Sequence, residues 1–171
     1  MLTPSLCESE IALVDIDEQR LNDSFMIVSA INKNCNEGRA KITPYLNRRE
    51  ALKGADYVVN AIQVGGYEPS TVIDFEIPKK YGLRQTIGDT LPVILEFLRD
   101  MEEICPQAYF LNYTNPMAMI TGAMQKASPI RSVGLCHSVQ GCASGLLKEL
   151  DMPTEGVQWK IAGINHMAWL L

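Results

Sequence analysis

Short apolar runs alternate with longer segments of helical period along most of this chain, and the alternation limits the folds that it can adopt. Residues 11–14 form a first apolar run, after which Leu21, Phe25 and Val28 repeat with the spacing of one helix face. A strand at 41–45, a short helix at 49–53 and an apolar run at 57–62 follow. Strands that alternate with helices favour parallel pairing. The sequence therefore predicts an α/β fold with helices on both faces of a parallel sheet.

The same pattern continues after a stretch rich in glycine and proline, which we expect to be a loop of roughly 25 residues. A helix around 94–101 precedes a strand at 109–111. The next helix is expected to begin near Pro116, because proline is favoured in a first helical turn. A strand at 132–135 then leads into a last helix. The apolar stripe expected on that helix consists of Val139, Cys142, Ala143, Leu146, Leu147 and Leu150.

Composition excludes several classes of protein. The formal charge of −5 and the pI near 5.0 argue against a nucleic-acid surface, which needs clustered Lys and Arg. No apolar run approaches the roughly 20 residues of a membrane span, and the start of the chain does not resemble a secretory signal. The five cysteines include no C-x-x-C pair. We therefore expect no membrane partner and a location in the reducing cytoplasm.

Unusual polar residues follow the predicted strands. Ligands of open α/β sheets bind outside the carboxyl ends of the strands, so these residues are expected to line one crevice. They are Asp15, Asn60, Gly65, Asn112, Asn115, Cys136 and His137.

Each of these positions also has an ordinary structural interpretation. Asp15 stands where a dinucleotide fold places the acid that accepts from ribose hydroxyls, but Asp15 or Asp17 could simply cap the helix. The glycine pair Gly65-Gly66 either lets a cofactor approach the backbone or makes a plain turn. The carboxamides of the segment 112–116 either contact a ligand or cap the helix after Pro116.

A thiol and an imidazole are candidate metal ligands. Cys136 and His166 lie 30 residues apart, so their spacing alone does not indicate a metal site. Their chemistry suits a divalent transition ion, and two protein ligands leave positions open for substrate oxygens. A small core cysteine and a buried, hydrogen-bonded histidine are the alternatives.

Taken together, several segments in order resemble lactate and malate dehydrogenases, and the chain resembles glycoside hydrolase family 4 more closely, above all its α-galactosidase type. The dehydrogenase resemblance rests on residues 14–17, 55–60, 112–116 and 163–166. The family 4 resemblance rests on residues 62–69, 85–90, 134–141 and 162–169. It implies a Rossmann-like, doubly wound parallel sheet. Residues 1–155 are then expected to form the dinucleotide-binding domain, and 156–171 to begin the substrate domain.

The resemblance also implies an NAD- and manganese-dependent glycosidase, one of the exceptions to the two-carboxylate mechanism. Oxidation of the sugar at C3 acidifies the C2 proton, and loss of that proton expels the C1 leaving group while the metal stabilises the enediolate. Water then adds and the hydride returns. The substrate implied is an unphosphorylated α-galactoside.

Site residues follow from the same resemblance. Cys136 and His166 are the implied metal ligands. The implied cofactor contacts are Asp15, Gln63 and Gly65, and the implied sugar contacts are Asp89 and Asn115. His137 stands next to the metal cysteine, where it would assist departure of the leaving group or orient the sugar.

The chain departs from the family pattern in three places. We find no first strand with its glycine loop, no Gly- and Arg-rich stretch between Thr90 and Pro92, and no second half after Leu171. An NAD-dependent 2-hydroxy-acid dehydrogenase and an inactive NAD-binding remnant are therefore the alternatives. Association into at least a dimer is expected, because an incomplete domain exposes apolar surface.

Overall fold

The computed structural model describes residues 1–84, 90–153, 155–164 and 167–171. The chain divides into two compact units, residues 1–55 and residues 56–171. In the described part of the chain, no helix combines the length and the apolar character needed to cross a membrane.

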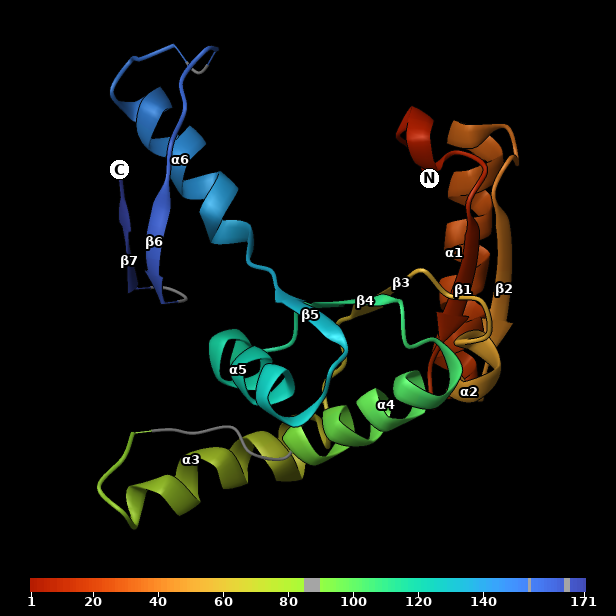
Figure 1. Ribbon diagram of the computed structural model, residues 1–171, viewed down its shortest axis with the longest axis horizontal. Helices are drawn as coiled ribbons and strands as arrows, with labels where there is room; N and C mark the ends of the chain where they lie inside the picture. The colour runs from red at the N-terminus through yellow and green to blue at the C-terminus, as the bar shows by residue number, and fades with distance from the viewer. Residues whose placement is uncertain (85–89, 154, 165–166) are drawn as a thin grey trace. The chain divides into compact units, whose positions relative to one another are not determined.

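The first unit is a strand, a long helix and a second strand (Figure 1). A 3-10 turn at Pro4–Leu6 precedes β1 (Glu10–Val14), which pairs in parallel with β2 (Lys41–Tyr45), and a short helix α2 (Arg48–Ala51) follows. Helix α1 (Glu18–Asn36) connects the two strands and buries Leu21. Near its carboxyl end, the buried Asn32 amide donates to the carbonyl of Ala40, the residue before β2, at 2.7 Å. The predicted order of elements is confirmed here.

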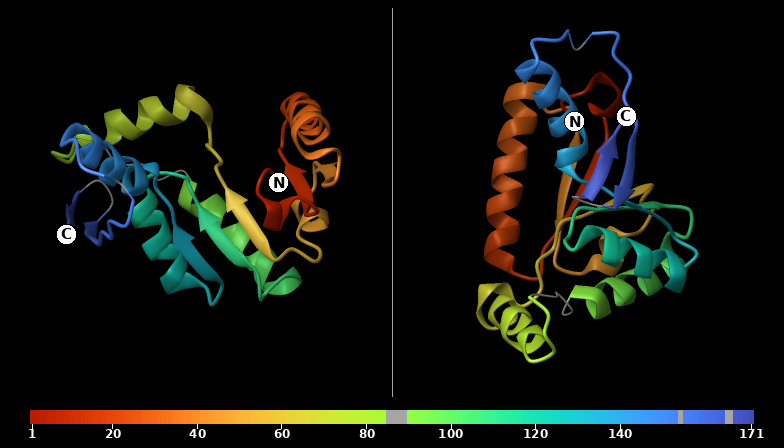
Figure 2. Two further views of the ribbon diagram at one scale, coloured as in Figure 1. Left: turned by 90° about the horizontal axis from the view of Figure 1, so that it is seen from above. Right: turned by 90° about the vertical axis from the view of Figure 1, so that its left-hand side faces the viewer.

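The second unit is built on a parallel sheet of three strands in the order β3-β4-β5. These strands are β3 (Tyr57–Asn60), β4 (Tyr109–Asn112) and β5 (Arg131–Gly134). Helices α4 (Thr90–Ile104) and α5 (Met117–Ala127) pack against each other and lie on the same side of this sheet (Figures 1 and 2). Strand β3 ends at Asn60, earlier than predicted, so residues 61–64 are free to line a site.

The prediction of a loop before α4 is wrong for part of that segment. A π-helical turn at Gly66–Thr71 leads into α3 (Val72–Lys79). Glycine and proline favour loops, but Pro69 lies before α3 and Pro78 lies in its last turn, where little of the helix follows. An ion pair between Lys79 Nζ and Glu76 Oε1, 2.7 Å long, also spans one turn of α3.

The last elements are α6 (His137–Glu149) and an antiparallel hairpin of β6 (Ile161–Ile164) and β7 (Met167–Leu170). The apolar stripe expected on α6 is only partly buried. Ala143 is 1% exposed, whereas Leu146 and Leu150 are 43% and 60% exposed. Helical spacing predicted the helix correctly, but spacing cannot say which face another element covers.

The core of the second unit lies between α4, α5 and β4. Phe97 and Phe110 meet edge to face, with ring centroids 5.8 Å apart. The largest side chains with less than 2% exposure are Phe110, Ile94, Leu98, Met101, Ile120, Met124 and Asn112. Asn112 is the one polar side chain among these seven, and it lies at the carboxyl end of β4.

Shortening a core side chain by one methyl group tests this packing. Ile94 is fully buried, so Ile94→Val is expected to lower the free energy of unfolding by about 0.5–1.5 kcal/mol. Ile73→Val makes the same change on α3 at a side chain that is 40% exposed, and about 0.5 kcal/mol or less is expected. Urea unfolding measures both. Equal losses would contradict the burial of Ile94 and the exposure of Ile73.

Candidate functional site

Three strand ends lie next to one another in the second unit. In the register of the parallel sheet, Asn60 pairs with Asn112, and Asn112 pairs with Gly134. Asn60 and Asn112 are 3% and 0% exposed. Carboxyl ends of parallel strands are where ligands of this fold bind, so the buried amides stand directly beneath a candidate site.

The two amides belong to one hydrogen-bonded network. Asn60 Nδ2 donates to Asn112 Oδ1 at 2.9 Å and to Thr114 Oγ1 at 3.0 Å. Thr114 Oγ1 donates in turn to the Ile62 carbonyl at 3.0 Å. The backbone N–H of Tyr113 donates to the Asn60 carbonyl at 2.8 Å. The chain after β3 and the chain after β4 are therefore fastened together.

A cavity of about 310 Å³ opens above this network. The predicted cofactor contact Gln63 and the predicted sugar contact Asn115 both line it, so the structure brings these two residues together. Asn115 Oδ1 also accepts from the backbone N–H of Met117, the first residue of α5, at 3.3 Å, although the N-cap of that helix is Pro116. The full lining is Ala61, Ile62, Gln63, Val64, Ser70, Thr71, Asp74, Thr90, Tyr113, Thr114 and Asn115.

Gly65 lies at a close approach of backbone to side chain beside this cavity. Its φ is +73°, and a β-carbon at this position would stand 1.7 Å from Ser70 Oγ. Gly66 also has a positive φ, +67°, but a β-carbon there would meet no heavy atom within 4 Å. Gly65 is thus required for the path of the chain into the cavity wall, and Gly66 only for the turn.

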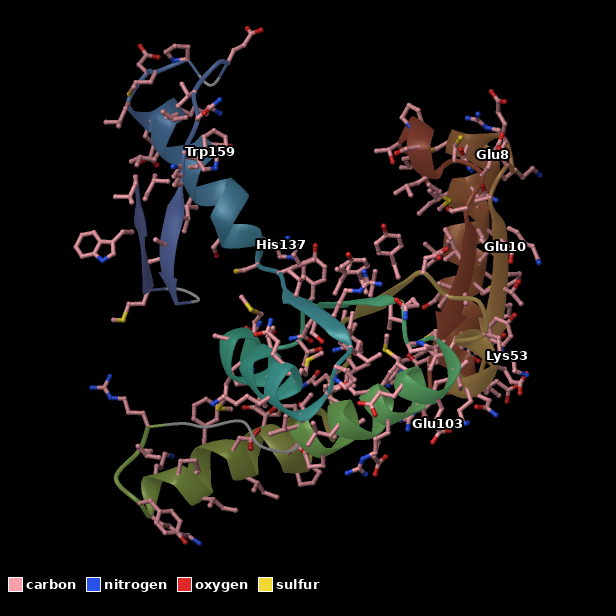
Figure 3. The ribbon with its side chains drawn as sticks, viewed as in Figure 1. Glu8, Glu10, Lys53, Glu103, His137 and Trp159 are labelled. Atoms are coloured by element: carbon pink, nitrogen blue, oxygen red, sulfur yellow. The ribbon has the colours of Figure 1, made fainter. Side chains whose placement is uncertain are left out.

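An aromatic contact joins the cavity wall to the end of β5. The rings of Tyr113 and His137 stack with centroids 5.4 Å apart. His137 is the first residue of α6, where Figure 3 labels it, and Cys136 precedes it as the N-cap. The backbone N–H of Leu135 donates to the Asn112 carbonyl at 2.9 Å, which fixes the start of this segment. The predicted catalytic His137 therefore lies against a residue that lines the cavity.

Asp15 lies in the other unit, after β1. Its carboxylate accepts from Arg20 Nη2 at 2.8 Å, from Arg20 Nε at 3.2 Å and from the Asp17 N–H at 2.9 Å. Hydrogen bonding from Arg20 and from the Asp17 backbone lowers the pKa of Asp15. Asp17, and not Asp15, caps α1, because Asp17 Oδ1 accepts from the Arg20 backbone N–H at 2.9 Å. Asp15 therefore stays ionised and can still accept further hydrogen bonds.

Two predicted site residues, Asp89 and His166, lie outside the described residues. Within the described part of the chain, no cluster of three or more His, Cys, Asp or Glu side chains is suited to a metal ion. Cys136 is half-buried at the start of α6. The predicted pairing of Cys136 with His166 stays a prediction.

Sequence reasoning missed one wall of the cavity. Ser70, Thr71 and Asp74 come from the turn and the first residues of α3, a segment that we expected to be a loop. Val72 and Phe75 are three residues apart, and Ile73 and Ile77 are four residues apart; that helical spacing was the available signal.

Comparison with known families settles the relationship. Residues 1–152 match the family described as Family 4 glycosyl hydrolase. The chain belongs to glycosyl hydrolase family 4. Among curated members, the chain is 53% identical to an α-galactosidase of Bacillus subtilis strain 168, over 100% of this chain and 42% of that protein. It is 38% identical to an α-galactosidase of Rhizobium meliloti strain 1021, over 98% and 36%. The chain thus spans about two fifths of the length of these family 4 relatives.

Solved structures show that this part of the family 4 chain is Rossmann-like. A 6-phospho-α-glucosidase from gut microorganisms, in complex with NAD and glucose-6-phosphate, is 26% identical with a TM-score of 0.78 over 95% of this chain and 39% of that one. Another 6-phospho-α-glucosidase structure, in complex with NAD and Mn²⁺, gives 20% and 0.77 over 95% and 39%. A lactate dehydrogenase from Cryptosporidium parvum gives 13% and 0.65 over 89% and 45%. The predicted dehydrogenase-like fold is confirmed.

Proposed function

We propose that this chain is the cofactor-binding part of an α-galactosidase that uses NAD and a divalent metal such as manganese. The observation that carries the proposal is the cavity at the ends of β3 and β4, with Gln63 and Asn115 in its wall and the Tyr113–His137 stack connecting it to Cys136. Ligands of this fold bind at such strand ends. Family membership supports the same reaction class.

The residues present fit part of a nicotinamide cofactor. A cavity of about 310 Å³ lies at the small end of ligand pockets and suits a nicotinamide with its ribose. Its amides and hydroxyls can both donate and accept, as a carboxamide and ribose hydroxyls require. Gly65 adds backbone without a side chain. Asp15, in the first unit, is proposed to accept from the adenosine ribose.

The donor chemistry of Cys136 fits a divalent transition metal, since a thiolate is a ligand that such ions prefer. The N-terminus of α6 favours negative charge at this position. We propose His166 as the second protein ligand. We also propose that residues 1–155 form the cofactor domain and that 156–171 begin the substrate domain.

The chain's own residues then have separate tasks. When bound, NAD supplies a reversible hydride acceptor for the sugar and the metal ion a Lewis acid. Asn115 and Asp89 hold the sugar by its hydroxyls, and Gln63 holds the cofactor against it. His137, at the end of β5, is placed to give a proton to the departing glycosidic oxygen. Tyr113 orients His137 through the ring stack.

We propose an unphosphorylated sugar as the substrate. Asn115, the proposed sugar contact, shares the cavity wall with the carboxylate of Asp74. A carboxylate repels a phosphate group but accepts hydrogen bonds from sugar hydroxyls, so this edge of the cavity suits a neutral sugar. The two α-galactosidase relatives support the same substrate class.

A hydroxy-acid dehydrogenase is the second candidate, since it shares the fold. The family match and the Cys136-His137 pair disfavour it, because that reaction uses histidine as a proton shuttle and has no task for a thiolate. A non-catalytic NAD-binding part is the third candidate. A cytoplasmic location and association into at least a dimer stay predictions.

One assay separates these candidates. The complete gene product, given NAD, Mn²⁺, a reductant and an aryl α-galactoside, is expected to release the aryl alcohol. EDTA should reduce the rate by roughly 100-fold or more, because a Lewis acid contributes several kcal/mol, and Mn²⁺ should restore it. A hydroxy-acid oxidation that persists in EDTA would instead favour the dehydrogenase. Failure to release alcohol from any α-glycoside would defeat the proposal.

A further inference from the structure

Asn60 is a buried polar residue for which the proposed reaction has no direct use. It lies at the end of β3, is 3% exposed, and does not line the cavity in the part of the chain described. Both hydrogens of its amide are donated, whereas Asn60 Oδ1 is buried without a hydrogen-bond partner in the described structure. Because buried amides usually have both their N–H groups and their oxygen paired, the unpaired Asn60 Oδ1 is unusual.

The orientation of the Asn60 amide is set by its neighbours. The Thr114 backbone N–H donates to Asn112 Oδ1 at 3.2 Å, and Asn112 Nδ2 donates to the Thr114 carbonyl at 3.0 Å. These backbone partners fix which way the Asn112 amide points. Asn60 must therefore present its Nδ2 to Asn112 Oδ1, because the reverse orientation would place two acceptors against each other.

The network connects the two cavity walls through two side chains, Asn60 and Thr114. Residues 61–64 follow Asn60 directly, and residues 113–115 follow Asn112. The Asn60 amide bonds to the second wall at Thr114, and Thr114 bonds back to the first wall at the Ile62 carbonyl. A chain of hydrogen bonds of this kind fixes the distance between the walls more sharply than apolar packing does.

We propose that Asn60 is a positioning residue that holds residues 61–64 and 113–115 in register for ligand binding. The proposal rests on the proposed function, because the ligand named is the nicotinamide part of NAD. Asn60 acts through Thr114 and Asn112 and touches no reacting atom. The unpaired Asn60 Oδ1 is consistent with this role. The orientation in which Nδ2 donates to Asn112 and Thr114 is the one that leaves Oδ1 without a partner among the described residues.

Removing the Asn60 amide should leave no other group of the network without a partner. Asn112 Oδ1 keeps the Thr114 N–H, and Thr114 Oγ1 keeps the Ile62 carbonyl. Asn60→Val is therefore expected to change thermal stability little. A residue needed only for stability would behave in the opposite way, losing stability without a specific loss of binding.

Two readouts test the proposal in the complete gene product. In the ligand-free protein, Asn60→Val should speed amide hydrogen exchange in residues 61–64 and 113–115. The Kd for NAD should rise by roughly 10-fold or more, as is common for residues that support a binding group. Thr114→Val should act in the same direction, whereas Thr114→Ser keeps the hydroxyl and should stay within about 3-fold of wild type.

Ser132→Ala is the matched control. Ser132 is 8% exposed on β5, and its hydroxyl donates to the Ile130 carbonyl, away from the cavity. Exchange at both walls and the Kd for NAD should be unchanged in it. Unchanged exchange in Asn60→Val, or equal loss of NAD binding in Ser132→Ala, would overturn the positioning role. Faster exchange in a protein whose wild type binds no NAD would instead refute the proposed function alone.

Discussion

In the complete gene product, replacing Cys136 by serine is expected to reduce the proposed α-galactosidase activity roughly 1,000-fold, with a matching loss of affinity for Mn²⁺. Serine preserves the size of the side chain but replaces a soft thiolate by a neutral hydroxyl. Lewis-acid stabilisation is worth several kcal/mol, and each 1.4 kcal/mol corresponds to a factor of ten in rate. The rate of aryl galactoside cleavage and calorimetric titration with Mn²⁺ measure the two effects.

Cys142 supplies the control for this substitution. It lies on the same helix α6 and is exposed, so Cys142→Ser changes the same atoms away from the proposed metal. We expect wild-type activity and metal affinity. If Cys136→Ser also kept both, the thiol would be a structural residue and the metal proposal would fail.

Adding one methyl group at Gly65 is expected to raise the Kd for NAD roughly 100-fold. Two effects combine in Gly65→Ala. The φ of +73° is unfavourable for any residue with a β-carbon, and that carbon would stand 1.7 Å from Ser70 Oγ and 2.6 Å from Ser70 Cβ. Because Ser70 lines the cavity, relief of this overlap must displace the wall. Fluorescence titration with NAD measures the change.

Gly54→Ala separates the strain from the overlap. Gly54 has nearly the same φ, +75°, but a β-carbon there meets no heavy atom within 4 Å. It should lower stability by about 1 kcal/mol, as expected for alanine in this conformation, and leave the affinity for NAD unchanged. Similar NAD affinities in the two variants would show that Gly65 serves the turn only.

The proposed metal site consists of Cys136 and His166, and the structure describes only the first of these two residues. Cys136 is placed by β5, whose end is fixed to β4 by the Leu135 N–H, and by the start of α6. The stack of His137 on Tyr113 then relates this segment to the cavity. The roles proposed for Cys136 and His137 therefore both depend on how the carboxyl end of β5 is held.

Much of the fold could be predicted because periodicity reports burial. Leu21, Phe25 and Val28 have the spacing of one helix face, and the structure buries or half-buries all three. The strands at 57–60, 109–112 and 131–134 were likewise predicted from short apolar runs, with boundaries one or two residues different. Helix α3 was missed because its flanking glycines and prolines indicate a loop more strongly than its short apolar pattern indicates a helix.

Sequence by itself determined the α/β class, the family and the identity of the residues at the strand ends, since these depend on local periodicity and on residue type. Tertiary structure alone decided that Gln63 and Asn115 share a cavity, that Tyr113 stacks on His137, and that Asn60 fastens the two walls. The physical reason is the separation in sequence of the residues that interact. A strand end is set by its neighbours in the chain, whereas a hydrogen bond between residues 60 and 114 exists only after β3 and β4 have paired in register.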